Sequence, residues 1–150
     1  MIDSHAHLSF PQFDSDREDV IRRAREAGLV AIVEIGADLE SSRAAVTLAE
    51  RHEFIHATVG IHPHDAETLT PAALAELREL VRHPKVVAVG EIGLDYYRDL
   101  SPRAVQRRAF EAQLALAAEV GALQGQPQGQ PLGQPQGQPL GQPQGQPQGQ

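Results

Sequence analysis

The sequence predicts an α/β fold with a parallel sheet, because strand-like and helix-like segments alternate in strict order through residues 1–123. The strand candidates are short apolar runs rich in β-branched side chains, and the helix candidates carry apolar stripes at helical spacing. Four such strand–helix units in succession favour parallel strands joined by right-handed crossovers.

The strand candidates are separated by helix and loop segments. Residues 1–3 begin the first strand, and residues 29–35 form an apolar run that only Glu34 interrupts, as in strands buried on both faces. The third and fourth strands are expected at residues 55–61 and 86–92.

The expected helices have recognisable starts or stops. Residues 14–16 offer three N-caps for the first helix, and Gly28 ends it. Thr70 is expected as an N-cap before Pro71, which is favoured at the first helical position. The expected helices span residues 14–27, 39–52, 71–81 and 102–120, and Gly121 is expected to stop the last of them.

Composition limits the classes of protein to which the chain can belong. At 150 residues it has room for one domain, and its net charge of −7 gives no broad basic surface for binding nucleic acid independently of sequence. The absence of cysteine excludes disulfides and thiolate metal sites. Because we find no signal peptide and no apolar stretch near the ~20 residues of a membrane span, we expect a soluble, cytoplasmic protein without membrane contact.

Composition changes abruptly after residue 123. Residues 124–150 repeat a tetrad of the form x-Gly-Gln-Pro and contain almost no apolar side chains. A proline at every fourth position is incompatible with helices and central strands, and the segment offers no core to offset its ordering entropy. We therefore expect a folded part at 1–123 and a disordered Gly/Gln/Pro tail at 124–150.

Two histidines one residue apart follow the first strand candidate. In an extended chain alternate side chains share a face, so His5 and His7 would project together and could hold one divalent ion. The alternative is a pair of solvated or hydrogen-bonded histidines. Glu91 favours the metal site, because a carboxylate in an apolar strand needs a cation, a donor or water beside it. An arginine partner or exposure to solvent is the alternative for Glu91.

Other polar side chains follow the later strands in the same way. His62 and His64 come after the third strand, and Glu91 and Asp95 lie at the end of the fourth. Because sites in parallel α/β sheets and barrels lie at the carboxyl ends of the strands, we expect these residues at one edge of the sheet.

Three segments of the sequence resemble the TatD family of metal-dependent hydrolases. They are residues 2–8 (IDSHAHL), 59–64 (VGIHPH) and 90–98 (GEIGLDYYR), and their order makes the resemblance specific over residues 1–121. Members of this family are TIM (β/α)8-barrel enzymes of the amidohydrolase group associated with DNase activity. The resemblance therefore implies a partial TIM barrel of about four β-α units, and a hydrolase that acts on ester bonds.

The resemblance also implies a metal centre. His5 and His7 would bind a first divalent ion, and Glu91 would bridge it to a second ion and serve as the catalytic carboxylate. The ion would be Mg²⁺, Mn²⁺ or Zn²⁺, and nucleic acid would be the substrate.

The same resemblance places His62, His64 and Asp95 on the substrate side of the site, where they would contact a phosphodiester oxygen. For His64 and Asp95, a local hydrogen-bonding or capping role is an equal alternative. One position departs from the family pattern, because Ser9 stands where an acidic or amide residue normally follows the first motif.

The later ligands of a two-metal site have no counterpart in this sequence. No histidine occurs beyond His83 and no acidic residue beyond Glu119, so at most three metal ligands are available. Two ions about 3.5–4 Å apart stabilise the attacking and leaving oxygens together, whereas three ligands suit one weakly bound ion. We therefore expect a truncated enzyme with impaired catalysis, whose reading frame was ended by a frameshift into repetitive DNA.

Two further interpretations stay open. A non-catalytic, metal-binding half-barrel could self-associate through its open sheet edges, with the tail as a tether or polyproline ligand. Another class of metallophosphoesterase also begins with H-x-H, but the motif around Glu91 disfavours it.

Overall fold

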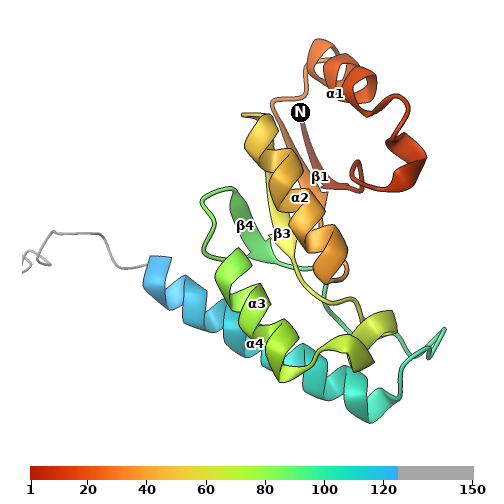
Figure 1. Ribbon diagram of the computed structural model, residues 1–150, viewed down its shortest axis with the longest axis vertical. Helices are drawn as coiled ribbons and strands as arrows, with labels where there is room; N and C mark the ends of the chain where they lie inside the picture. Colours follow the sequence, from red (N-terminus) through yellow and green to blue (C-terminus); the bar gives the residue numbers. More distant parts are fainter. Residues whose placement is uncertain (125–150) are drawn as a thin grey trace, which may run out of the picture.

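Four parallel strands form the sheet on which the chain is built. The computed structural model describes residues 1–124, and its strands follow the order β1-β2-β3-β4 (Figure 1). This sequential order confirms the parallel, alternating arrangement expected from the sequence. The strands are β1 (Ile2–Ala6), β2 (Ala31–Ile35), β3 (Ile55–Val59) and β4 (Val86–Val89).

Helices occupy the connections between the strands and follow the last one. They are α1 (Arg17–Glu26), α2 (Leu39–Arg51), α3 (Pro71–Leu80) and α4 (Arg103–Gln124). α2 packs against β2 and β3, and α4 packs against β4 with α3 beside it (Figure 1). Two short 3-10 segments, η1 (Pro11–Phe13) and η2 (Pro63–Thr68), lie in the loops after β1 and β3.

Side chains cap the starts of two helices. Asp38 precedes α2, and its carboxylate accepts from the backbone N–H of Ser41 at 2.7 Å. The hydroxyl of Ser41 accepts in return from the backbone N–H of Asp38 at 2.9 Å, which completes a capping box. Thr70 caps α3 as expected, because its hydroxyl accepts from the backbone N–H of Ala73 at 3.1 Å.

Two helix ends differ from the sequence-based expectation. α1 begins only at Arg17, and Asp16 precedes it without a capping hydrogen bond from its side chain. The carboxylate of Asp14 pairs with Arg17 instead, at 2.5 Å. The predicted stop at Gly121 is wrong, because α4 continues to Gln124. One glycine costs a helix about 1 kcal/mol relative to alanine, and the alanine-rich turns around it offset that cost.

Two strand ends near the candidate site differ from the expected ones. β1 extends to Ala6, so His5 lies inside the strand and not after it. β4 stops at Val89, which leaves Glu91 in the loop that follows. Both shifts keep these side chains at the carboxyl end of the sheet.

The core lies between the helices and one face of the sheet. Ile32, Ala57 and Val59 face the helices and are at most 2 % exposed. Val33 alternates with Ile32 and is only half-buried, and Val87 is 55 % exposed. The second strand is therefore buried on both faces only at its end, where Ile35 is 5 % exposed, because the helices cover only one face of the sheet.

Two expectations concern features outside this sheet. No helix in residues 1–124 is both long and apolar enough to cross a membrane. Residues 125–150 lie outside the described part of the chain, so the disordered tail stays a prediction.

Candidate metal centre

Three potential metal ligands converge at the carboxyl edge of the sheet. His5 lies near the end of β1, His7 directly follows that strand, and Glu91 lies in the loop after β4. One donor atom from each residue lies within 4.8 Å of the other two. Within the part of the chain that the structure describes, this is the only cluster of three such groups. The structure therefore brings together the three residues expected to bind metal.

The distances in this cluster fit a tetrahedral cation. The Nε2 atoms of His5 and His7 are 3.1 Å apart, and His5 Nε2 is 3.7 Å from Glu91 Oε2. Zinc bonds of about 2.0–2.2 Å to nitrogen and oxygen would separate tetrahedral donors by about 3.3–3.6 Å. Small side-chain adjustments would therefore suffice to hold a divalent ion.

His7 is oriented so that its Nε2 is free to ligate. Its Nδ1 lies 3.2 Å from the carbonyl oxygen of Ile35, and because a carbonyl only accepts, we assign the ring proton to Nδ1. Nε2 then carries the lone pair that a metal needs. The ring of Phe10 stacks on His7 with the centroids 4.6 Å apart, which restrains the plane of the imidazole.

His62 faces the same carboxylate but offers a proton instead of a lone pair. Its Nδ1 accepts from the backbone N–H of His64 at 3.2 Å, so the neutral ring carries its proton on Nε2. That Nε2 lies 3.8 Å from Glu91 Oε1. Burial lowers the pKa of His62 from its ordinary value of 6.5, and the charge of neighbouring His64 lowers it further. His62 is therefore placed as a neutral donor beside Glu91.

His64 and Asp95 pair with each other beside this group. His64 Nε2 contacts Asp95 Oδ2, and Asp95 Oδ1 accepts from the backbone N–H groups of Tyr97 and Arg98 at 2.9 and 3.0 Å. The Arg98 N–H and then the His64 imidazole lower the pKa of Asp95 from 3.8 to about 2. Both side chains make the local hydrogen bonds that were their alternative role, and contact with substrate stays a prediction.

A buried carboxylate that sequence reasoning passed over holds the loop after His7. Glu34 of β2 is fully buried and accepts from the backbone N–H groups of Leu8 and Ser9 at 2.8 Å each. The Ser9 hydroxyl also donates to Glu34, at 2.6 Å. Glu34 shares with Glu91 the sequence signal of a carboxylate in an apolar strand, which requires a buried partner.

Two buried glutamines of α4 hold the loops that follow β3 and β4. Gln113 accepts from the N–H of Ile61 at 2.7 Å and donates to its carbonyl at 3.1 Å. Gln106 does the same for Asp95, at 2.8 and 3.1 Å. Both glutamines are 1 % exposed, yet nothing in the local sequence distinguishes them from solvated glutamines on a helix.

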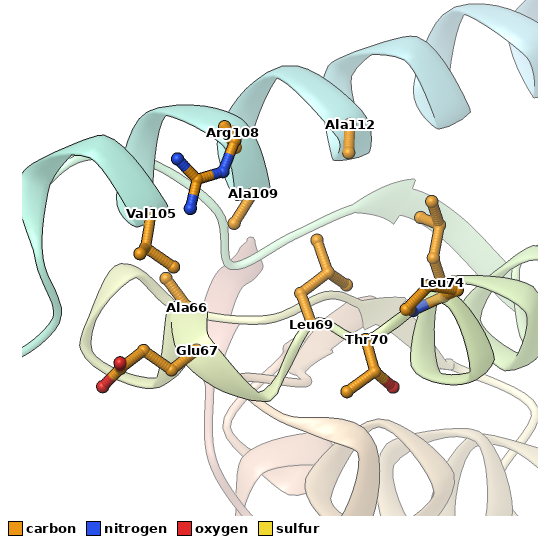
Figure 2. A pocket seen from close by; sticks show the side chains of 10 residues that line it. Ala66, Glu67, Leu69, Thr70, Leu74, Val105, Arg108, Ala109 and Ala112 are labelled. Carbon is orange, nitrogen blue, oxygen red and sulfur yellow. The ribbon is translucent and has the colours of Figure 1, made fainter.

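Two hollows in the surface differ in their relation to the ligands. His5, Thr58 and Glu91 are among the residues that line a hollow of about 260 Å³. A hollow of about 540 Å³ lies between η2, α3 and α4, where Leu69 and Ala109 face it (Figure 2). The larger hollow is lined mostly by small and apolar side chains and by none of the candidate ligands. The candidate ligands His5 and Glu91 therefore lie at the smaller hollow.

Comparison with known proteins identifies the family of the chain. The family model of TatD related DNases matches residues 2–123. The chain belongs to the TatD family. It is 48 % identical over 122 residues to the 3'-5' ssDNA/RNA exonuclease TatD of Musicola paradisiaca, and 45 % identical over 120 residues to the metal-dependent hydrolase YabD of Bacillus subtilis. These matches cover 81 % and 80 % of the chain but 46 % and 47 % of the relatives, so the chain spans about half their length.

Solved structures of TatD proteins share this fold. The crystal structure of YjjV, a TatD homologue of Escherichia coli K12, matches with a TM-score of 0.74 at 35 % identity, over 81 % of this chain and 48 % of that one. A TatD family hydrolase of Entamoeba histolytica gives the same TM-score at 26 % identity, over 81 % of this chain and 46 % of that one. The four strand–helix units are thus part of a TatD TIM barrel, which confirms the expected fold class.

Proposed function

We propose that this TatD chain binds one divalent cation through His5, His7 and Glu91 and acts on phosphodiester bonds of nucleic acid. The convergence of three donor atoms within 4.8 Å carries the proposal. The relative from Musicola is named as an exonuclease for single-stranded DNA and RNA, which supports nucleic acid as the substrate class. A cytoplasmic location, favoured by the cysteine-free composition, is part of the proposal.

The residues around the ion would orient the reacting groups. When bound, a divalent cation supplies a Lewis acid for a phosphoryl oxygen and lowers the pKa of water. Glu91 directs Oε2 toward His5 and Oε1 toward His62, so one oxygen can ligate while His62 Nε2–H orients the other. His62 is held neutral by burial and would also donate to a phosphate oxygen that enters beside Glu91.

We propose that Zn²⁺ or Mn²⁺ binds this site more tightly than Mg²⁺ does. Two imidazoles and one carboxylate are a donor set that suits zinc and other transition metals. Mg²⁺ prefers octahedral oxygen ligands and binds through carboxylates and phosphates. Among divalent first-row metals the affinity of such sites rises from Mn²⁺ to Zn²⁺.

We further propose that catalysis by the 150-residue chain is impaired. A second ion would have to share Glu91 with the first, because the described residues provide no other cluster of three potential metal ligands. The sequence beyond Glu119 adds neither a histidine nor a carboxylate side chain. The leaving oxygen would therefore lack the second cation that stabilises it in two-metal sites.

Isothermal titration of the full chain with Zn²⁺, Mn²⁺ and Mg²⁺, combined with cleavage assays on single-stranded DNA and RNA, tests the proposed function. We expect one ion per chain, with affinity in the order Zn²⁺, Mn²⁺, Mg²⁺. Glu91→Gln should weaken binding by roughly 10-fold or more and remove any metal-dependent cleavage. Glu50→Gln makes the same charge change at a distant pair with His83 and should leave both unchanged. Wild-type affinity in Glu91→Gln would overturn the site.

A second candidate function is a metal-binding module that self-associates. Among the described residues, β1 and β4 are each paired on one side only, and Ile2 and Val87 on these strands are 60 % and 55 % exposed. Unpaired strand edges with apolar side chains favour pairing with a second copy of the chain. Sedimentation at increasing concentrations would then show a dimer, whereas a monomer at every concentration would eliminate this candidate.

A further inference from the structure

We propose that Glu34 is a positioning residue for the metal ligand His7, and that Glu34 and Arg17 together form a loop clamp on residues 8–10. The inference rests on the proposed function, because it explains how one of the proposed ligands is held. It concerns a buried carboxylate that takes no part in the metal cluster itself.

The carboxylate of Glu34 is committed to the loop. It is fully buried, and its hydrogen bonds come from Leu8 N–H, Ser9 N–H and the Ser9 hydroxyl, at 2.8, 2.8 and 2.6 Å. No basic side chain forms an ion pair with Glu34 within residues 1–124. Burial of a charge is costly unless hydrogen bonds compensate it, so the loop must keep these donors in place for the folded state to persist.

Arg17 holds the same loop from the opposite side. Its Nε donates to the Leu8 carbonyl at 2.6 Å, and its Nη2 donates to the carbonyls of Ser9 and Phe10 at 3.3 and 3.2 Å. The loop therefore turns N–H groups toward an anion and carbonyl groups toward a cation. The Glu34 carboxylate and the Arg17 guanidinium therefore favour the same orientation of the loop, because charge-assisted hydrogen bonds are stronger than neutral ones.

The clamp bears directly on His7. The clamped loop begins at the residue after His7, and it carries Phe10, whose ring stacks on the imidazole at 4.6 Å. The residue after Glu34 on β2 is Ile35, whose carbonyl accepts from His7 Nδ1 at 3.2 Å. One short stretch of β2 thus fixes both the ring and the loop. Removing a residue that orients a metal-binding side chain in this way typically lowers metal affinity 10–100-fold.

Ser9 fits this arrangement. Its hydroxyl is a donor at 2.6 Å from the buried carboxylate, whereas an acidic side chain at the same position would set two carboxylates against each other. Ser9 and Glu34 are therefore a matched pair, in which the acceptor lies on β2 and the donor lies in the loop. This pairing explains why an acidic residue would be unfavourable at position 9 of this chain.

Glu34→Gln tests the clamp, because an amide nitrogen cannot accept the donors that the carboxylate oxygens accept. We expect Zn²⁺ affinity, measured by titration calorimetry on the full chain, to fall roughly 10-fold or more. In the metal-free protein, imidazole NMR shifts should show His7 losing its fixed Nδ1–H tautomer. The matched control is Lys85→Met, which removes three bonds to the carbonyls of His52, Glu53 and Ile55 at the opposite end of β3. Lys85→Met should lower the melting temperature and leave the Zn²⁺ affinity within about twofold of the wild-type value.

Several outcomes would overturn the clamp. Wild-type affinity and an unchanged His7 tautomer in Glu34→Gln would do so, as would an equal loss of affinity in Lys85→Met. If Glu34→Gln does not fold, Ser9→Ala removes one donor only and should weaken Zn²⁺ binding severalfold, and no change there would count against the clamp. If the wild-type chain binds no ion, the proposed function fails, and the His7 tautomer in metal-free Glu34→Gln still decides whether the clamp exists.

Discussion

His7 and His62, which both lie near Glu91, differ in which nitrogen carries the proton. His7 has its proton on Nδ1, directed to the Ile35 carbonyl, and His62 has its proton on Nε2 because the His64 N–H occupies Nδ1. A backbone acceptor thus makes one ring a ligand, and a backbone donor makes the other ring a hydrogen-bond donor. The two rings are not interchangeable, although both lie near the same carboxylate.

We predict that replacing His5 and His7 together by alanine abolishes Zn²⁺ and Mn²⁺ binding, whereas His62→Ala retains it. Ligation needs neutral imidazole, so the affinity of the wild-type chain should also fall as pH is lowered and the rings protonate. Titration calorimetry at several pH values measures both effects, with His83→Ala as a control that removes a distant histidine paired with Glu50. Unchanged binding in the double variant would place the ion elsewhere, for example at His62 and His64.

We also predict a characteristic pH dependence for Asp95→Asn. The folded-state pKa of Asp95 is lowered from 3.8 to about 2, so the carboxylate stabilises the fold above pH 3.8 and loses this effect as pH falls through about 2. The difference in the free energy of unfolding between wild type and variant should be constant from pH 7 to about 5 and should narrow at lower pH. Urea denaturation at a series of pH values measures it, and an equal difference at pH 7 and pH 2 would contradict the prediction.

The sequence predicted the metal cluster more fully than the residues that support it. His5, His7 and Glu91 could be found because strand ends in parallel sheets meet at one edge, and that rule needs only local spacing. Glu34 was passed over as an interruption of an apolar run. Its partners lie in a loop 25 and 26 residues away in the sequence, and no local pattern indicates such a pairing.

Helix and strand order could be predicted because each element carries its own period and start signal. Thr70 caps its helix as expected, since a capping side chain contacts only the next turn. The start of α1 was missed because Asp14 pairs with Arg17 and caps nothing. Whether Asp14 forms an ion pair or caps the helix depends on the conformation of the loop, which the local sequence does not determine.

Replacing Gly121 and Gly28 by alanine should change the free energy of unfolding in opposite directions. Gly121 lies inside α4, and an added Cβ would meet no atom within 4 Å, so Gly121→Ala should raise the free energy of unfolding by about 0.5–1 kcal/mol. Gly28 follows α1 with φ of +91°, so Gly28→Ala should lower it by about 1–2 kcal/mol even though space is available. Urea denaturation measures both changes, and equal signs would contradict the assignment of the two backbone conformations.

At the scale of the whole molecule, the net charge and the number of metal ligands both predict slow cleavage of nucleic acid. The net charge of −7 gives a phosphate backbone no long-range attraction, and the three-ligand cluster suits one ion. We therefore predict that the purified 150-residue chain cleaves single-stranded DNA far more slowly than ordinary enzymes, for which turnover is about 1 per second or more. Steady-state assays with Mn²⁺ and Zn²⁺ measure this rate. Turnover in the ordinary range from the monomer would contradict the single-ion reading.

Gln106 and Gln113 tie the loops after β3 and β4 to α4, and this has a consequence for the order of events on the ribosome. Translation delivers His5 and His7 first, but the loops that carry His62 and Asp95 gain their buried partners only when α4 has been synthesised. A nascent chain stalled before Gln106 would present a pair of histidines without the ordered loops opposite them. Completion of the site during biosynthesis is thus coupled to the emergence of a helix that contributes no ligand to it.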